Sequence, residues 1–175
     1  MTQPVAAVVL AAGEASRFGA PKQRILLPFV LERLARVPVD EIVVVEGAHP
    51  LGPSTTRLSG VPYRVVHCPD WERGPGASLR CGLRSLGPEV EAAVVVLADG
   101  PDLAPEAVTR VLDDWRAQGG IVAASYGGAR GHPLALGRVD WDDVPDEGLQ
   151  ARAVRLVPCD DLGAPGDVDT LEDLG

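Results

Sequence analysis

The sequence contains no apolar run long enough to cross a membrane. Its longest apolar stretches, such as 5–12 and 92–98, are far shorter than the roughly 20 residues that a membrane helix requires. No basic segment precedes residues 5–12, and a polar loop follows them where a signal peptide would have its cleavage site. We therefore expect no signal peptide, no membrane contact and a cytoplasmic protein.

Cysteine is also scarce. The chain has three cysteines, an odd number, and no C-x-x-C pair occurs among them: Cys68, Cys81 and Cys159. This pattern is typical of reduced thiols, and it argues against a disulfide framework and against a thiolate zinc site.

Positive charge is in deficit: 16 basic residues stand against 25 acidic ones, a net charge of −9. Nucleic-acid binders depend on basic patches, so this balance excludes that class. Residues 1–36 nevertheless hold five bases and two acids, a local charge of +3, so the rest of the chain carries −12. The N-terminal part is therefore suited to a small anion.

Apolar strand-like runs alternate with helical patterns along the 175 residues. We expect strands at 5–10, 41–45, 63–67, 92–98, 121–125 and 154–158, and helices at 26–36, 78–86 and 105–118. Residues 127–148 have no regular pattern. The alternation predicts a single domain (1–175) with a three-layer α/β/α sandwich and a mostly parallel, Rossmann-like sheet. Ligands bind such sheets at the carboxyl ends of the strands.

The loop after the first expected strand carries the clearest motif, LAAGEASRFGAPK, from Leu10 to Lys22. Its small residues let backbone amides approach a phosphate, and Arg17 and Lys22 supply positive charge. It is neither a Walker A loop nor a G-x-G-x-x-G fingerprint. Lys22 is the only lysine in the chain, which favours a role that a guanidinium does not fill.

Three further segments hold candidate polar side chains. Asp99 ends the strongest strand pattern, where a carboxylate suits Mg²⁺, and the alternative is a turn in which Asp102 caps the next helix. Asp167 and Asp169 stand in GDVDTLEDL near the C-terminus. His132, in YGGARGHP, is a lone histidine, a type that is more often structural than catalytic.

Taken in order, LAAG, SRFG and PK resemble the signature of the MobA-like nucleotidyltransferases, and the resemblance extends from Val5 to Leu174. It implies a nucleotide-diphospho-sugar transferase-like fold. It also implies transfer of a nucleoside monophosphate from an NTP to a phosphorylated acceptor, with release of pyrophosphate. The roles it implies for single residues are nucleotide binding by Leu10, Ala11, Ala12, Gly13, Gly76 and Ser78, catalysis by Arg17, Lys22 and Asp99, and a Mg²⁺ site made of Asp99 with Asp167 or Asp169.

The GHP stretch is similar to that of the molybdenum cofactor cytidylyltransferases, in which it lines the acceptor pocket. Arg130 and His132 are then the acceptor-binding residues, and the acceptor is a molybdopterin cofactor. Relatives that transfer GMP tend to carry asparagine where this chain has Asp167 and Asp169, so CTP is the favoured NTP. Contact with a molybdoenzyme follows as a possible partnership.

Three alternatives stay open: guanylyl transfer, transfer to a sugar 1-phosphate or phospholactate, and a catalytically weak nucleotide-binding protein that assists molybdoenzyme maturation. Two departures from the family favour the last. Gly100 stands where relatives have glutamine, and the loop after Lys22 is shortened, so that residues 25–28 lead directly into the first expected helix.

Overall fold

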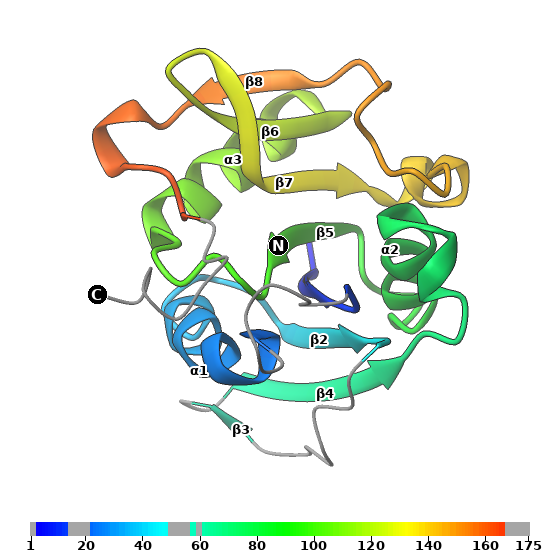
Figure 1. The fold of residues 1–175 in the computed structure, drawn as a ribbon. Helices are drawn as coiled ribbons and strands as arrows, with labels where there is room; N and C mark the ends of the chain where they lie inside the picture. Colours follow the sequence, from blue (N-terminus) through cyan, green and yellow to red (C-terminus); the bar gives the residue numbers. More distant parts are fainter. Residues whose placement is uncertain (1–2, 14–21, 49–56, 59–60, 167–175) are drawn as a thin grey trace.

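The computed structural model describes residues 3–13, 22–48, 57–58 and 61–166. Within these ranges the chain forms eight strands, three α-helices and three short 3₁₀ helices (Figure 1). The strands are β1 (Val5–Ala11), β2 (Glu41–Glu46), β3 (Arg57–Leu58), β4 (Val61–His67), β5 (Ala92–Leu97), β6 (Ile121–Tyr126), β7 (Ala129–Gly137) and β8 (Arg155–Pro158). The helices are α1 (Lys22–Leu34), α2 (Pro75–Arg84), α3 (Pro105–Gln118), η1 (Trp71–Arg73), η2 (Arg138–Asp143) and η3 (Asp160–Leu162).

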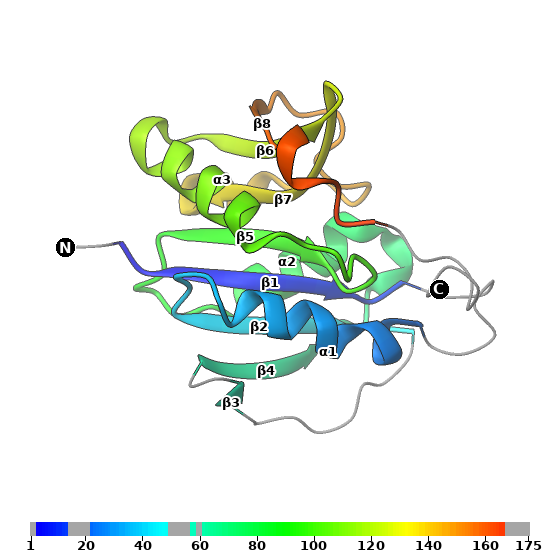
Figure 2. The same cartoon turned by 90° about the vertical axis from the view of Figure 1, so that its left-hand side faces the viewer.

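All eight strands form one sheet in the order β3-β4-β2-β1-β5-β7-β6-β8. The neighbours of β1 and β2 are parallel, and β7 runs antiparallel between β5 and β6. Helices α1 and α3 cover one face and α2 covers the other, as Figures 1 and 2 show. The predicted three-layer, mostly parallel α/β fold is confirmed.

The two faces of the sheet explain the apolar sequence of its central strands. Alternate residues of β1 point to opposite cores: Val5, Val9 and Ala11 pack with α1 and α3, whereas Ala6 and Val8 pack with α2. A strand that is buried on both faces needs apolar residues at every position. The continuous runs in the sequence are therefore the signature of the sheet's centre.

The predicted strands and helices are all present, with bounds that differ by up to four residues. α3 has the predicted bounds, but α1 begins at Lys22 and α2 at Pro75, each before the expected start. The alternative role of Asp102 as a helix cap is wrong. Ala104 is the N-cap of α3 without a side-chain cap bond, and the Asp102 amide donates to Pro165 O at 3.0 Å.

Strand β7 was not predicted, although it lies inside the sheet. Its first half contains Arg130, Gly131, His132 and Pro133, which break any two-residue alternation. Proline is tolerated in a central strand mainly at a bulge, and the β6–β7 register shifts between Ala123 and Ser125, opposite this stretch. The irregular sequence pattern that prevented prediction of β7 therefore matches an irregular pairing in the sheet.

The expectation of three reduced thiols is wrong for two of them. Cys68 and Cys81 form a disulfide, and Cys159 is a buried free cysteine. The pairing arises because Cys68 directly follows β4 and α2 packs beside that strand, which brings the two Cα atoms to 5.8 Å. Sequence spacing alone does not reveal this approach.

No helix in the described part of the chain combines the length and the apolar character that a membrane crossing requires.

Candidate active site

The carboxyl ends of β1 and β5 lie side by side at the centre of the sheet. Leu10 pairs with Leu97, and the Ala98 amide donates to Leu10 O at 3.0 Å. In the sheet, β2 and β4 lie on one side of β1, and β5 lies on its other side, so the strand order reverses direction at β1. Such a switch point is where open α/β sheets bind ligands.

The first cavity, of about 330 Å³, opens at this edge. Its walls come from the end of β1, the end of β5, and the segment formed by η1 and the start of α2. The lining residues are Leu10, Ala12, Gly13, Trp71, Glu72, Gly74, Pro75, Ser78, Leu97 and Asp99.

Most of the predicted nucleotide-side residues meet in the first cavity: Leu10, Ala12, Gly13, Ser78 and Asp99 all line it. Ala11 does not, because its side chain is buried in the core beneath α1 and α3. The loop motif and the β5 carboxylate, far apart in sequence, therefore belong to one site.

Gly76 lines neither of the cavities described here. Its amide donates to Asp146 O at 2.8 Å, and a Cβ built on it would lie 1.6 Å from Pro145 O. The absence of a side chain allows the segment 144–148 to lie directly on the start of α2. In this structure Gly76 is a packing position.

Trp71 and Glu72 are cavity residues that sequence reasoning missed. Trp71 packs over Gly47, where a Cβ would lie 2.6 Å from the Trp71 Cβ. Both residues belong to η1, a single 3₁₀ turn that has no periodicity to detect. An aromatic residue shortly before the Gly74-Pro75-Gly76 turn was the one available signal.

The second cavity, of about 480 Å³, forms where β7 separates from β5. The β5–β7 pairing runs from Ala92 with Gly137 to Val95 with Leu134 and stops there. The lining residues are Leu10, Pro75, Leu79, Val95, Leu97, Arg130, Gly131, His132, Leu134, Glu147, Gly148, Leu149 and Gln150. Three of them, Leu10, Pro75 and Leu97, also line the first cavity, so the two adjoin.

Arg130 and His132, the predicted acceptor-binding residues, both line the second cavity. Arg130 donates to Leu149 O at 2.7 Å and to Arg152 O at 3.4 Å. Within the described residues its hydrogen bonds go only to carbonyls, so its charge remains available to an anion. Burial lowers the pKa of His132, the charge of Arg130 lowers it further, and Asp99 opposes the shift. The imidazole is therefore neutral near pH 7.

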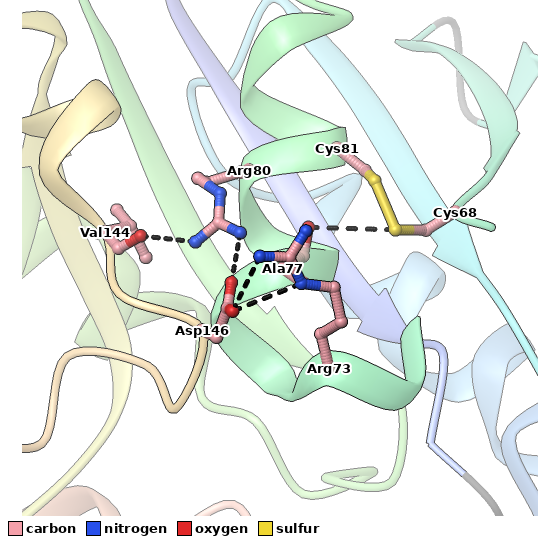
Figure 3. Close-up of polar contacts among 7 residues, drawn as sticks. All are labelled: Cys68, Arg73, Ala77, Arg80, Cys81, Val144 and Asp146. Carbon is pink, nitrogen blue, oxygen red and sulfur yellow. Dashed lines mark hydrogen bonds and ion pairs between the residues drawn. A yellow bond between two sulfur atoms is a disulfide. The ribbon is translucent and has the colours of Figure 1, made fainter. Parts of the chain in front are cut away.

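Asp146, which directly precedes the lining residues 147–150 of the second cavity, is paired with Arg73 of η1 and Arg80 of α2 (Figure 3). Its carboxylate accepts hydrogen bonds from Arg80 and from Arg73, the latter at 3.0 and 3.2 Å, and Arg80 also donates to Val144 O at 2.5 Å. The bond from Arg80 and then that from Arg73 hold the pKa of Asp146 below its usual range. Residues 147–150, which line the second cavity, follow Asp146 directly. The two arginines that hold Asp146 therefore also position this wall of the cavity.

Asp99 offers a carboxylate, the type of ligand that a hard divalent cation prefers, in the lining of the first cavity. The chain that leads to Asp167 passes close by: Pro165 O accepts from the Asp102 amide, and a Cβ on Gly100 would lie 3.1 Å from the Pro165 Cβ. Residues 99–102 and 165–166 are thus neighbours, which fits a metal site shared between these segments.

Four predicted site residues fall wholly or partly outside the described part of the chain. Arg17, Asp167 and Asp169 lie outside the described residues, and so does the side chain of Lys22, although its backbone begins α1. The described residues alone contain no group of three histidine, cysteine or acidic side chains arranged to hold a metal ion.

Comparison with known protein families gives one match. The model of the MobA-like NTP transferase domain matches residues 7–157. No curated protein is similar enough in sequence to count as a relative.

Several solved structures are similar to this chain over nearly its whole length. Rv0371c from Mycobacterium tuberculosis H37Rv is 30% identical, with 98% of this chain and 96% of that chain covered and a TM-score of 0.78. A manganese complex of Rv0371c gives 25% identity, 98% and 96% coverage, and a TM-score of 0.72. The 4-diphosphocytidyl-2C-methyl-D-erythritol synthase from Anaerococcus prevotii DSM 20548, at 15% identity, 98% and 93% coverage and a TM-score of 0.69, shares the fold.

Proposed function

Because the chain belongs to the MobA-like NTP transferase family and is a nucleotidyltransferase, we propose that it transfers CMP from CTP to a phosphorylated acceptor of the molybdopterin class and releases pyrophosphate. One observation carries this proposal. Two adjoining cavities share Leu10, Pro75 and Leu97, and they hold Asp99 on one side and Arg130 on the other. A donor nucleotide and an anionic acceptor therefore have separate compartments that meet at one edge.

The reaction needs alignment and charge neutralisation more than proton transfer. An acceptor phosphate oxygen, already ionised near pH 7, attacks the α-phosphorus, and the bond to pyrophosphate breaks. Arg130 would hold the acceptor phosphate, and the neutral His132 would contribute a hydrogen bond. From the sequence motif we assign Arg17 and Lys22 to the triphosphate and to the charge that develops on pyrophosphate.

A divalent cation, Mg²⁺ by preference, would be held by Asp99 with Asp167 or Asp169. When bound, such an ion supplies positive charge to the phosphates. The manganese complex of the similar Rv0371c supports a divalent-metal site. The preference for CTP rests on the paired aspartates, and the acceptor class rests on the Gly131-His132-Pro133 stretch that lines the second cavity.

Calorimetric titration tests the donor half of the proposal. CTP, GTP, ATP and UTP are titrated into the protein with and without Mg²⁺, and selective Mg²⁺-dependent binding of CTP is expected. Asp99→Asn should lose the Mg²⁺-dependent part, while Asp102→Asn, a neighbouring exposed carboxylate outside both cavities, should keep it. Preference for GTP would indicate guanylyl transfer, and binding of no NTP would refute the proposal.

Turnover is then followed by a coupled pyrophosphate assay with molybdopterin, sugar 1-phosphate and phospholactate acceptors. Lys22→Ala and Asp99→Ala should each abolish pyrophosphate release and leave the circular dichroism spectrum unchanged. Full activity in a well-folded Asp99→Ala protein would remove the metal assignment.

A second candidate is a nucleotide-binding protein with little turnover that assists molybdoenzyme maturation. Gly100 favours it, because Pro165 lies beside the position where relatives have a glutamine side chain. Tight NTP binding without pyrophosphate release, with every acceptor, would support this candidate.

A further inference from the structure

The Cys68–Cys81 disulfide closes a loop that carries one wall of the first cavity. The two cysteines are 13 residues apart, and their Cα atoms are separated by 5.8 Å, within the usual range for a disulfide. Between them lie η1 and the start of α2, which supply Trp71, Glu72, Gly74, Pro75 and Ser78 to the cavity lining. The Cys68–Cys81 bond is the one disulfide in the described part of the chain.

The first part of the loop is held by few contacts, of which the packing of Trp71 against the core on the α2 side of the sheet is one. η1 has no buried residue, and Arg73, on its surface, is tied to Asp146. The disulfide anchors the far end of the same loop to β4 (Figure 3). The positions of Trp71 and Glu72 therefore depend on a few tethers, of which the disulfide is one.

We propose that Cys68 and Cys81 form a reversible thiol–disulfide site that sets the affinity of the first cavity for its nucleotide. The ligand in this proposal rests on the proposed function, whereas the redox site itself does not. Disulfides in a cytoplasm, where we expect this protein, are usually transient and redox-sensing rather than structural.

The reaction is ordinary thiol–disulfide exchange with a dithiol. One thiolate of the reductant attacks Cys81 Sγ, the Cys68–Cys81 bond breaks, and a mixed disulfide forms; the second thiol of the reductant then displaces Cys81. The protein gains two electrons and two protons as two thiols, and the reductant becomes a disulfide. Cys81 is the expected point of attack because it is the more exposed of the two residues: it is only partly buried, whereas Cys68 is fully buried.

The structure accommodates both states. Cys68 Sγ lies 3.7 Å from Ala77 O (Figure 3), so the reduced thiol finds a hydrogen-bond acceptor without leaving its buried position. Reduction thus removes a covalent tether and leaves no buried donor unpaired. What changes is the freedom of residues 69–80, which NTP binding then has to order.

Affinity measurements on two defined redox states test this proposal. The full chain is oxidised with glutathione disulfide or reduced with dithiothreitol, its free thiols are counted, and CTP is titrated in the presence of Mn²⁺. We expect the oxidised protein to bind at least about fivefold more tightly, the lower end of common coupling between linked sites. Cys81→Ser should bind like the reduced protein under both conditions, and Cys159→Ser, at the buried free cysteine, should behave like the unaltered chain.

Equal affinity in the two states, with the thiol count confirming them, would overturn the proposal. A count of three free thiols after oxidation, in place of the one expected from Cys159, would overturn it too. Hydrogen exchange of the protein without nucleotide gives a second, independent readout. Amides in 71–78 should exchange faster after reduction, and unchanged exchange would overturn the thiol–disulfide site. If no NTP binds in either state, the proposed function fails, and the exchange result alone decides the redox site.

Discussion

Replacing Gly76 with alanine tests whether this glycine is a packing position. Alanine in place of glycine ordinarily favours a helix by about 0.5–1 kcal/mol. Here the new Cβ would lie 1.6 Å from Pro145 O and 2.8 Å from Gly148 N, and both are backbone atoms that no rotamer change moves away. The segment 145–148 would have to retreat by about 1.4 Å to reach the 3.0 Å lower limit of real contacts.

That retreat breaks the 2.8 Å hydrogen bond from the Gly76 amide to Asp146 O. Overpacking costs about 1–3 kcal/mol, and the lost hydrogen bond costs about 1 kcal/mol. After the helix gain is subtracted, Gly76→Ala should destabilise the protein by about 2 kcal/mol, which lowers the Tm by about 4–8 °C in a domain of this size.

Urea unfolding followed by far-ultraviolet circular dichroism measures this change. Gly87→Ala is the matched control, because the nearest atoms to its Cβ belong to the flexible Glu89 side chain. The control should change stability by less than about 0.5 kcal/mol. A stabilised Gly76→Ala protein would refute the packing argument. Unchanged stability with weakened NTP binding would instead make Gly76 a nucleotide contact.

Two further predictions concern the second cavity. Burial and Arg130 hold the pKa of His132 below 6.5, so below pH 6.5 the unfolded chain binds more protons than the folded one. Stability should therefore fall as the pH drops from 6.5 towards the lower pKa of the folded state. The fall in the urea midpoint between pH 7.5 and pH 5 should be smaller in His132→Gln, and an identical fall in both proteins would contradict this assignment. Asp146→Asn should loosen the wall that Arg73 and Arg80 fix, and amide hydrogen exchange at Gly76 and Gly148 should become faster. The control is Asp113→Asn, which removes an exposed carboxylate 3.9 Å from Arg116 and should leave exchange at these glycines unchanged. Unaltered exchange in Asp146→Asn would show that the backbone contacts alone hold the wall.

The fold was predictable because the buried strands consist of continuous runs of apolar residues. The meeting of Leu10 and Asp99 was predictable too, since parallel strands bring their carboxyl ends to one edge. β7 was not, because Gly131 and Pro133 interrupt its pattern at the point where it leaves β5. The second cavity lies where the two strands separate.

Long-range packing explains the remaining misses. Trp71 enters the first cavity through a 3₁₀ turn, and Asp146 reaches α2 across more than 60 residues of sequence. The cysteine pairing likewise depends on α2 lying beside β4. Such contacts depend on how distant segments pack, which no local pattern encodes.

The hairpin between β6 and β7 has a consequence for redesign of the enzyme. Gly127 and Gly128 form its turn with φ of 61° and 80°, and a Cβ on either would meet nothing within 4 Å. Because β7 is antiparallel, the hairpin rises at the same edge as both cavities, directly before Arg130. A longer hairpin grafted here would extend the rim of the second cavity, the proposed acceptor site, while β1 and β5 stay unchanged. If the proposed division of the two cavities holds, an insertion at this point would alter the acceptor range separately from nucleotide binding.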